Sequence, residues 1–144
     1  MQGGSGSRPA IFWMTAVSAV LMIVGGFGPW ATAFGETAGG TDVNDGWFLI
    51  VPALLALGLL FVQVARPRSR WPMILVALLG ALGALVAGVN LSDINSLAGE
   101  NVFLDDAIDA GWALYLSQIA SFALICCSVS TLVRRPYLRA AATA

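Results

Sequence analysis

The side chains that could do chemistry in this chain are mainly carboxylates and hydroxyls, because histidine and lysine are both absent. The segment "TDVNDGW" brings Asp42, Asn44 and Asp45 close together just before Trp47. Oxygen ligands at similar spacing begin a calcium loop, but here the third oxygen comes one residue early and the closing glutamate is missing. A turn in which Asn44 or Asp45 caps a following helix is therefore the favoured interpretation, and a cation site is the alternative.

A second acidic segment covers residues 92–111 and is long for a connection between helices. Its apolar residues recur at a spacing that makes one helix face: Phe103, Leu104, Ala107 and Ile108. Acidic side chains take the opposite side: Asp105, Asp106 and Asp109. We therefore expect a short helix here, which either caps the bundle or docks a partner through Phe103, Leu104 and Ile108.

Together the two acidic segments suggest a metal-site hypothesis. In this hypothesis a divalent cation would be gathered by five carboxylates: Asp42, Asp45, Asp105, Asp106 and Asp109. No other cofactor is indicated, since a Schiff-base lysine and a haem-binding histidine are both missing. No Ser/His/Asp or Cys/His set can be assembled, so we expect no enzyme. There is no basic stripe with interleaved aromatic residues, so we expect no nucleic-acid partner.

Four apolar segments must position these residues. The chain has 144 residues, of which 58% are hydrophobic and 10% charged. A helix needs about 20 apolar residues to cross a bilayer. Four segments meet that length and contain no charge: residues 11–33, 47–65, 71–91 and 112–133. The expected fold is an all-α bundle of four transmembrane helices with a short extra helix in the second acidic segment.

Charge sorts completely along the chain. All seven arginines lie before the first span, between the second and third, or after the fourth. All eight acids lie in the other two connections. By the positive-inside rule, we expect a multi-pass membrane protein with both termini in the cytoplasm. The absence of lysine and histidine beside abundant Ala, Gly, Leu and Val suggests a GC-rich bacterial genome, and hence a bacterial cytoplasmic membrane.

The spans suggest one domain over residues 10–135, with flexible tails at 1–9 and 136–144. "RP" and "GW" recur at matching span boundaries about 65 residues apart. Two similar helical hairpins would explain this, and so would the shared demands of each membrane interface. "ATA" at 31–33 also fits a signal-peptidase site, although an uncleaved span is favoured.

Small and hydroxylated residues mark the expected packing faces. Gly80, Ala84 and Gly88 recur every four residues, a spacing that lets helix backbones approach closely. The fourth span carries Ser117, Ser121 and Ser128 on roughly one face, which would pack inside the bundle, line a polar path or form a subunit seam. The expected interfacial anchors are four tryptophans: Trp30, Trp47, Trp71 and Trp112.

Three short motifs carry a resemblance at the level of topology: "FGPWA", "TDVNDGW" and "DAGWALYL". They resemble small four-span membrane proteins of unknown function that are common in actinobacteria. The resemblance covers the whole chain and implies the four-span fold, but it implies no activity. The chain departs from the tetraspan junction proteins of animals, whose outer Trp and Cys signature is missing.

These features predict a non-catalytic accessory or scaffold subunit of a larger cell-envelope membrane complex. Its expected partners are the lipid bilayer and other membrane subunits or further copies of itself. Two alternatives stay open. One is a homo-oligomeric channel or small-solute transporter lined by the serine face, and the other is an outward-facing sensor of a divalent cation or another ligand.

Overall fold

The fold is seen in a computed structural model that describes residues 7–33, 36–42, 44–66, 69–100 and 108–142. Side chains are described within 10–32, 36–42, 44–66, 69–96 and 110–133. The expected residues Phe103, Leu104, Asp105 and Asp106 lie outside the described residues, and so do the side chains of Ile108 and Asp109.

Four helices account for most of the described chain. They are α1 (Ser7–Phe27), α2 (Trp47–Ala65), α3 (Trp71–Glu100) and α4 (Trp112–Ala142). Each contains a stretch long and apolar enough to cross a membrane. The expectation of a mainly helical chain with four such helices is therefore confirmed.

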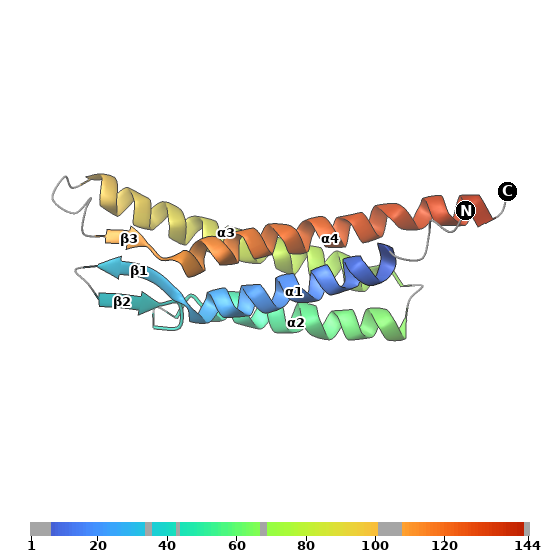
Figure 1. The fold of residues 1–144 in the computed structure, drawn as a ribbon, viewed down its shortest axis with the longest axis horizontal. Coiled ribbons are helices and arrows are strands. Elements are labelled where there is room, and N and C mark those ends of the chain that lie inside the picture. Colours follow the sequence, from blue (N-terminus) through green and yellow to red (C-terminus); the bar gives the residue numbers. More distant parts are fainter. Residues whose placement is uncertain (1–6, 34–35, 43, 67–68, 101–107, 143–144) are drawn as a thin grey trace.

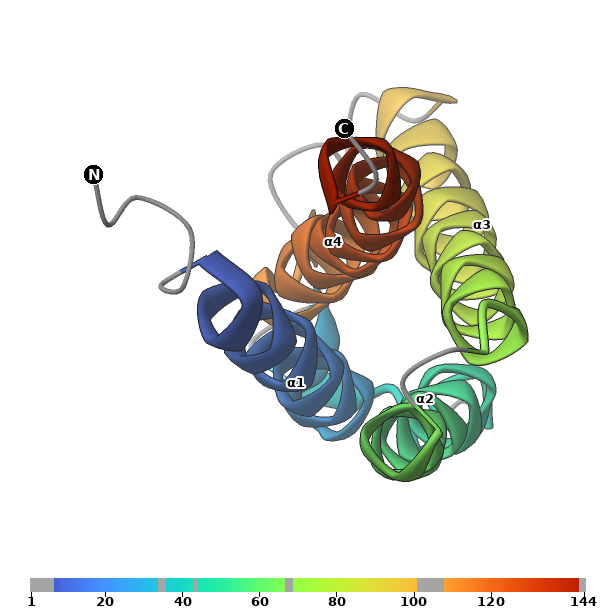
Figure 2. The ribbon, with the colours of Figure 1, turned by 90° about the vertical axis from the view of Figure 1, so that its right-hand side faces the viewer.

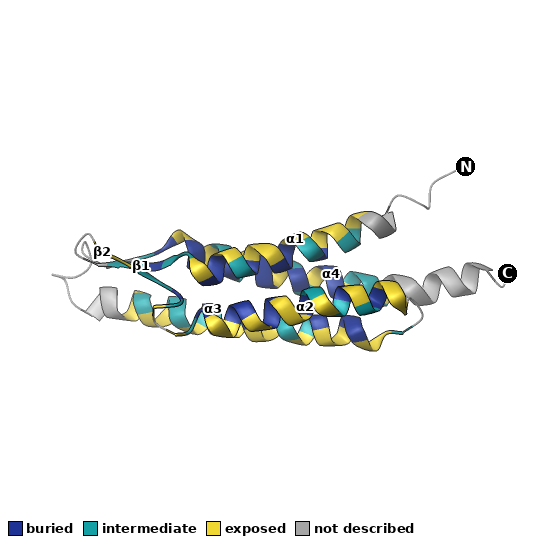
Figure 3. Cartoon of the chain, turned by 90° about the horizontal axis from the view of Figure 1, so that it is seen from below, coloured by how far each residue is buried: buried dark blue, intermediate teal, exposed yellow. Residues whose placement is uncertain are grey.

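The helices form a ring in which each contacts two neighbours (Figure 2). α1 packs on α2 and α4, and α3 completes the ring by packing on the same two helices. Buried and exposed residues alternate along each helix, so each helix has a buried face and an exposed face rich in apolar residues (Figure 3). Helix α1, for example, buries Ala19 and Met22 while exposing Trp13 and Val17.

A small antiparallel sheet closes one end of the bundle, called the sheet end below (Figure 1). Its strands are β1 (Pro29–Ala33), β2 (Glu36–Gly39) and β3 (Ile108–Ala110), in the order β2-β1-β3. The central residue Thr32 pairs with Thr37 on one side and with Asp109 on the other. The sheet thus ties the α1–α2 connection to the α3–α4 connection.

This sheet corrects three expectations. The described chain is not all-α, and the first apolar helix ends at Phe27 rather than at residue 33. Glycines at 25, 26 and 28 weaken the helix, and the residue before Pro29 disfavours helical geometry. The described part of the expected short helix, Ile108–Ala110, is a strand because its backbone pairs with β1.

The helix ends differ from expectation elsewhere as well. α3 runs on to Glu100, well beyond the expected end at residue 91. α4 continues to Ala142, so the backbone of residues 136–142 is helical, and the expected flexibility of this tail stays a prediction. The hairpins α1–α2 and α3–α4 lie side by side, and a duplication as their origin stays a prediction.

Two helical glycines allow a direct test of close packing. A β-carbon at Gly25 would overlap the Ser117 hydroxyl and lie 2.9 Å from the backbone oxygen of Ala113. We expect Gly25→Ala to lower the free energy of unfolding by about 1–3 kcal/mol, because α1 and α4 must separate. Nothing lies within 4 Å of a β-carbon at Gly58. Gly58→Ala should raise the free energy by up to ~1 kcal/mol. Denaturant titration in mild detergent measures both, and equal effects would contradict this packing.

Candidate functional site

The hydroxyl face of α4 points into the bundle. Ser117, Ser121 and Ser128 are all fully buried. The Ser117 hydroxyl donates to the backbone oxygen of Ala113 at 2.8 Å, and Ser128 donates to Leu124 at 2.7 Å. Such bonds to the preceding turn satisfy a hydroxyl within its own helix. Ser117 and Ser128 therefore serve packing without needing any other partner.

Ser121 differs from its neighbours. Its hydroxyl is buried and has no hydrogen-bond partner within the described part of the chain, and the same is true of the Gln118 side-chain oxygen. Both residues face α3, where Gly83 leaves room for Ser121 and Gly88 lies beside the Gln118 amide. Unpaired buried polar atoms are uncommon because each gives up its hydrogen bonds to water. The Ser121 hydroxyl and the Gln118 side-chain oxygen therefore form a candidate binding site for water or a small polar ligand.

The small residues of α3 are used inside the bundle. A β-carbon at Gly80 would lie 3.0 Å from the Ile125 side chain and 3.2 Å from the backbone oxygen of Ser121. Ala84 is half-buried, and a β-carbon at Gly88 would make only ordinary contacts of 3.7–3.8 Å with Gln118. The tightest position is Gly83, which the four-residue spacing misses. Its position three residues after Gly80 is the signal that could have identified it.

Two hydroxyls of α1 were also missed by the sequence analysis. Thr15 and Ser18 are buried and donate to the backbone oxygens of Ile11 and Met14 at 2.7 and 2.8 Å. They lie three residues apart on a helix, and that spacing puts them on one face. Buried hydroxyls therefore come from α1 as well as from α4, and those of Thr15 and Ser18 are satisfied by their own helix.

Trp30 is a structural residue of the sheet end and not an interfacial anchor. Its ring is only 2% exposed, and Nε1–H donates to the backbone oxygen of Gly25 at 2.8 Å. Gly40 lies directly against the ring, where any β-carbon would overlap it. The expectation for Trp30 is therefore wrong, because an anchor must present its ring to the membrane surface. The other three expected anchors are about half exposed: Trp47, Trp71 and Trp112.

Gly46 and Gly111 connect the starts of α2 and α4 to the segment around Trp30, called the junction below. The Gly46 N–H donates to Gly40 at 2.8 Å, and the Gly111 N–H donates to Trp30 at 2.6 Å. A β-carbon at Gly46 would lie 2.6 Å from the carbonyl carbon of Gly40. A β-carbon at Gly111 would lie as close to that of Pro29. Each "GW" pair thus combines a glycine that permits backbone contact with an exposed tryptophan.

The first acidic segment has a structural role in the described chain. Asp42 is exposed, and its carboxylate accepts the N–H of Gly39 at 2.9 Å at the end of β2. This bond occupies a backbone donor on the open side of an edge strand. Helix α2 has Gly46 as its N-cap with no side-chain hydrogen bond, so the expected capping by Asn44 or Asp45 is wrong. Asn44 instead adopts a positive φ of 65° in the turn.

The cation hypothesis finds no support in the described residues. They contain no group of three or more His, Cys, Asp or Glu side chains that could hold a metal ion. Asp42 and Asp45 lie in the turn after β2, whereas Asp109 lies in β3 on the opposite side of β1. The sites of Asp105 and Asp106 fall outside the described residues, so the sensor stays a prediction.

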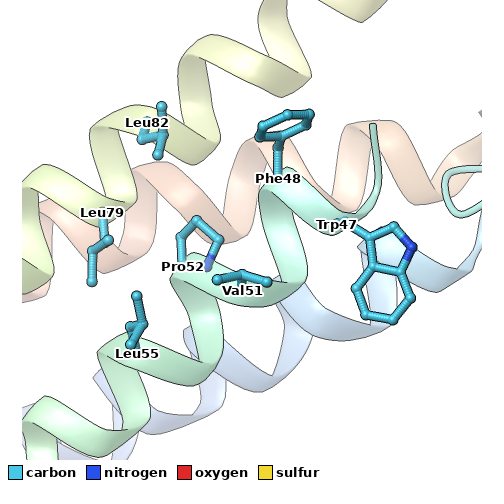
Figure 4. Close-up of a pocket in the computed structure, with 7 residues that line it drawn as sticks. All are labelled: Trp47, Phe48, Val51, Pro52, Leu55, Leu79 and Leu82. Carbon is cyan, nitrogen blue, oxygen red and sulfur yellow. The ribbon is translucent and has the colours of Figure 1, made fainter. Parts of the chain in front are cut away.

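An apolar groove of about 350 Å³ lies between α2 and α3 (Figure 4). It is lined by Trp47, Phe48, Val51, Pro52, Leu55, Leu79 and Leu82. The first five side chains come from the sheet-end half of α2, and the two leucines come from α3. Because its lining is almost wholly apolar, this α2–α3 groove suits a hydrocarbon chain or the apolar face of another helix.

Replacing Trp30 tests its place at the junction. We expect Trp30→Phe to lower the free energy of unfolding by about 1 kcal/mol or more, because the bond to Gly25 is lost and its buried acceptor is left unpaired. The matched control is Trp112→Phe, since Trp112 is 58% exposed and should change stability little. Thermal or denaturant unfolding in detergent compares the two. A larger loss for Trp112 than for Trp30 would contradict the buried role.

No protein-family model matches this chain, and comparisons with curated proteins and with solved structures give no significant match. The function has to be inferred from the features of the chain itself. Those features are the α2–α3 groove, the unpaired Ser121 and Gln118 atoms, and the separation of charge between the two ends.

Proposed function

We propose that this chain is a non-catalytic integral membrane protein that serves as an accessory or scaffold subunit of a larger complex in a bacterial cytoplasmic membrane. In this proposal the four apolar helices cross the bilayer. The sheet end faces outward and the arginine-bearing end faces the cytoplasm, following the positive-inside rule. The function lies in contact with other membrane subunits and not in bond-making chemistry.

The α2–α3 groove is the observation that carries this proposal. Most of the outward surface of the bundle is made of single apolar side chains, which lipid tails solvate as well as another protein surface would. In a bilayer, helices associate through shape and close packing, because lipid is as apolar as leucine. A groove that the chain's own side chains leave unfilled therefore offers a partner helix more contact than a smooth face does. Trp47 and Phe48 border it near the sheet end.

Helix α2 adds a second reason to place the partner there. Pro52 lines the groove from within the helix and lacks a backbone N–H, so it loosens hydrogen bonding one turn before it. Gly58 lies two turns further along α2 with no atom within 4 Å of where a β-carbon would be. Small residues on a lipid-facing helix allow another backbone to come close. α2 is therefore well suited to receive a further helix.

Photo-crosslinking from the groove tests the accessory role. A photoreactive side chain at Leu82 should form a single adduct with a foreign membrane subunit in native membranes. The same group at Ile119, which is 67% exposed on α4, is the matched control and should capture lipid only.

Filling the groove gives a second test of the accessory role. Leu82→Trp should fill the groove and reduce the amount of partner recovered in mild detergent several-fold, whereas Ile119→Trp should not. A clean homo-oligomer, or a lone monomer, would contradict an accessory subunit.

The unpaired polar atoms favour a second candidate function, a homo-oligomeric channel or small-solute transporter. Ser121 and Gln118 lie on successive turns of α4 with a hydroxyl and an amide oxygen unsatisfied in the described chain. Water or a passing solute would supply the missing hydrogen bonds. Ser117, Ser128 and Thr131 already donate to backbone oxygens of their own helix, so the path would depend mainly on Ser121 and Gln118.

Flux through liposomes distinguishes this candidate. If a solute passes Ser121, then Ser121→Ala should change the rate at least several-fold. Ser128→Ala should leave it unchanged, because the Ser128 hydroxyl is satisfied by Leu124. Both serines are fully buried on α4, so they form a matched pair. If the flux of every ion and small solute tested stays at the level of empty liposomes, the channel hypothesis is contradicted.

A further inference from the structure

The chain segments that carry the arginines lead to one end of the bundle. Arginines occur in three separate segments: Arg8, then Arg66, Arg68 and Arg70, then Arg134, Arg135 and Arg139. Helix α1 begins, α2 ends, α3 begins and α4 ends at the end of the bundle opposite the sheet (Figure 1). None of the eight acidic residues belongs to these segments. We call this end of the bundle the arginine end.

The arginines lie directly at the limits of the apolar stretches. Arg66 follows Ala65, the last residue of α2, and Arg70 precedes Trp71, the first residue of α3. Both arginine side chains are exposed. Arg134 follows Val133, where the apolar stretch of α4 ends. In a bilayer that fits these stretches, the charges therefore lie at the depth of the lipid headgroups, with Trp71 exposed beside them at the interface.

Helix α4 carries this basic character beyond the apolar stretch. Its backbone remains helical to Ala142, about nine residues past Val133. Arg135 and Arg139 are four residues apart and so occupy the same face of the continuing helix, with Arg134 about 100° away. A helix that leaves the bilayer with arginines in its first two turns keeps them near the membrane surface.

We propose that the arginine end binds the phosphate headgroups of anionic phospholipids in the leaflet that it faces. The segments at this end carry all seven arginines and no acidic residue in the sequence, and the ligand is negative and abundant at that depth. Arginine suits this partner because its guanidinium donates two parallel hydrogen bonds to phosphate oxygens. An acidic protein would first have to displace lipid from arginines that adjoin the apolar stretches. Lipid is therefore the occupant that the positions favour.

Competition between two lipids tests the proposal on the full-length protein. The chain is reconstituted in vesicles containing equal amounts of phosphatidylglycerol and phosphatidylcholine, extracted in mild detergent, and the retained lipid is counted by native mass spectrometry. We expect phosphatidylglycerol to be enriched, by up to about fivefold for each arginine engaged. About 1 M salt should reduce the enrichment strongly, because it shortens the screening length to ~3 Å.

Two double variants and one control locate the effect. Arg66→Gln with Arg70→Gln, and Arg135→Gln with Arg139→Gln, should each reduce the enrichment by about an order of magnitude or more. Thr37→Glu with Ser96→Glu lowers the net charge by the same amount at exposed positions of the sheet end and should leave it unchanged. Equal melting temperatures in phosphatidylcholine alone show that every variant is folded. Equal retention of both lipids, or enrichment that survives in both arginine variants, would overturn the proposal.

Discussion

With the four helices placed across a bilayer as proposed, the lack of water there is the constraint on which the rest of this structure depends. Every polar group placed there must find its partner within the protein. Buried hydroxyls such as Thr15, Ser117 and Ser128 meet this demand by donating to the preceding turn of their own helices. The irregular backbone between α1 and α2 meets it differently, because it is gathered at the sheet end and paired strand to strand. Ser121 and Gln118 are therefore notable as exceptions within the described chain.

Close backbone contact at the sheet end sets where the helices begin. The Trp30 ring is buried at the junction and its N–H donates to Gly25. Gly46 and Gly111, which directly precede α2 and α4, let their backbones lie close to those of Gly40 and Pro29. Because α2 starts from Gly46, its first three turns carry Trp47, Phe48, Val51, Pro52 and Leu55 along the side that borders the α2–α3 groove. The α2–α3 groove is lined by residues of these two helices. It belongs to the fold and not to a loop.

The sequence was sufficient for the helices but not for the features that join them. Uncharged apolar stretches of about 20 residues identify the spans, because both length and composition follow from the bilayer. The strands were missed because they are short, contain mainly Ala, Gly and Thr, and depend on pairing between residues 29–33 and 108–110. The end of α1 was within reach, since three glycines and Pro29 occur there. Trp30 was misjudged because tryptophan near a span end indicates an interface only if its ring faces outward, which depends on tertiary packing.

The two ends and the middle of the molecule offer different kinds of recognition. Charge is confined to the ends, where water and headgroups make electrostatic contacts useful. The middle is apolar, and in a bilayer it would gain nothing from touching another apolar surface unless the two shapes fit, because lipid would already solvate it. Single outward side chains such as Ile119 cannot provide that fit, whereas a groove bordered by two helices can. In the proposed role, shape along α2 and α3 recognises a membrane partner, while charge at the ends sets the orientation of the chain and contacts lipid headgroups.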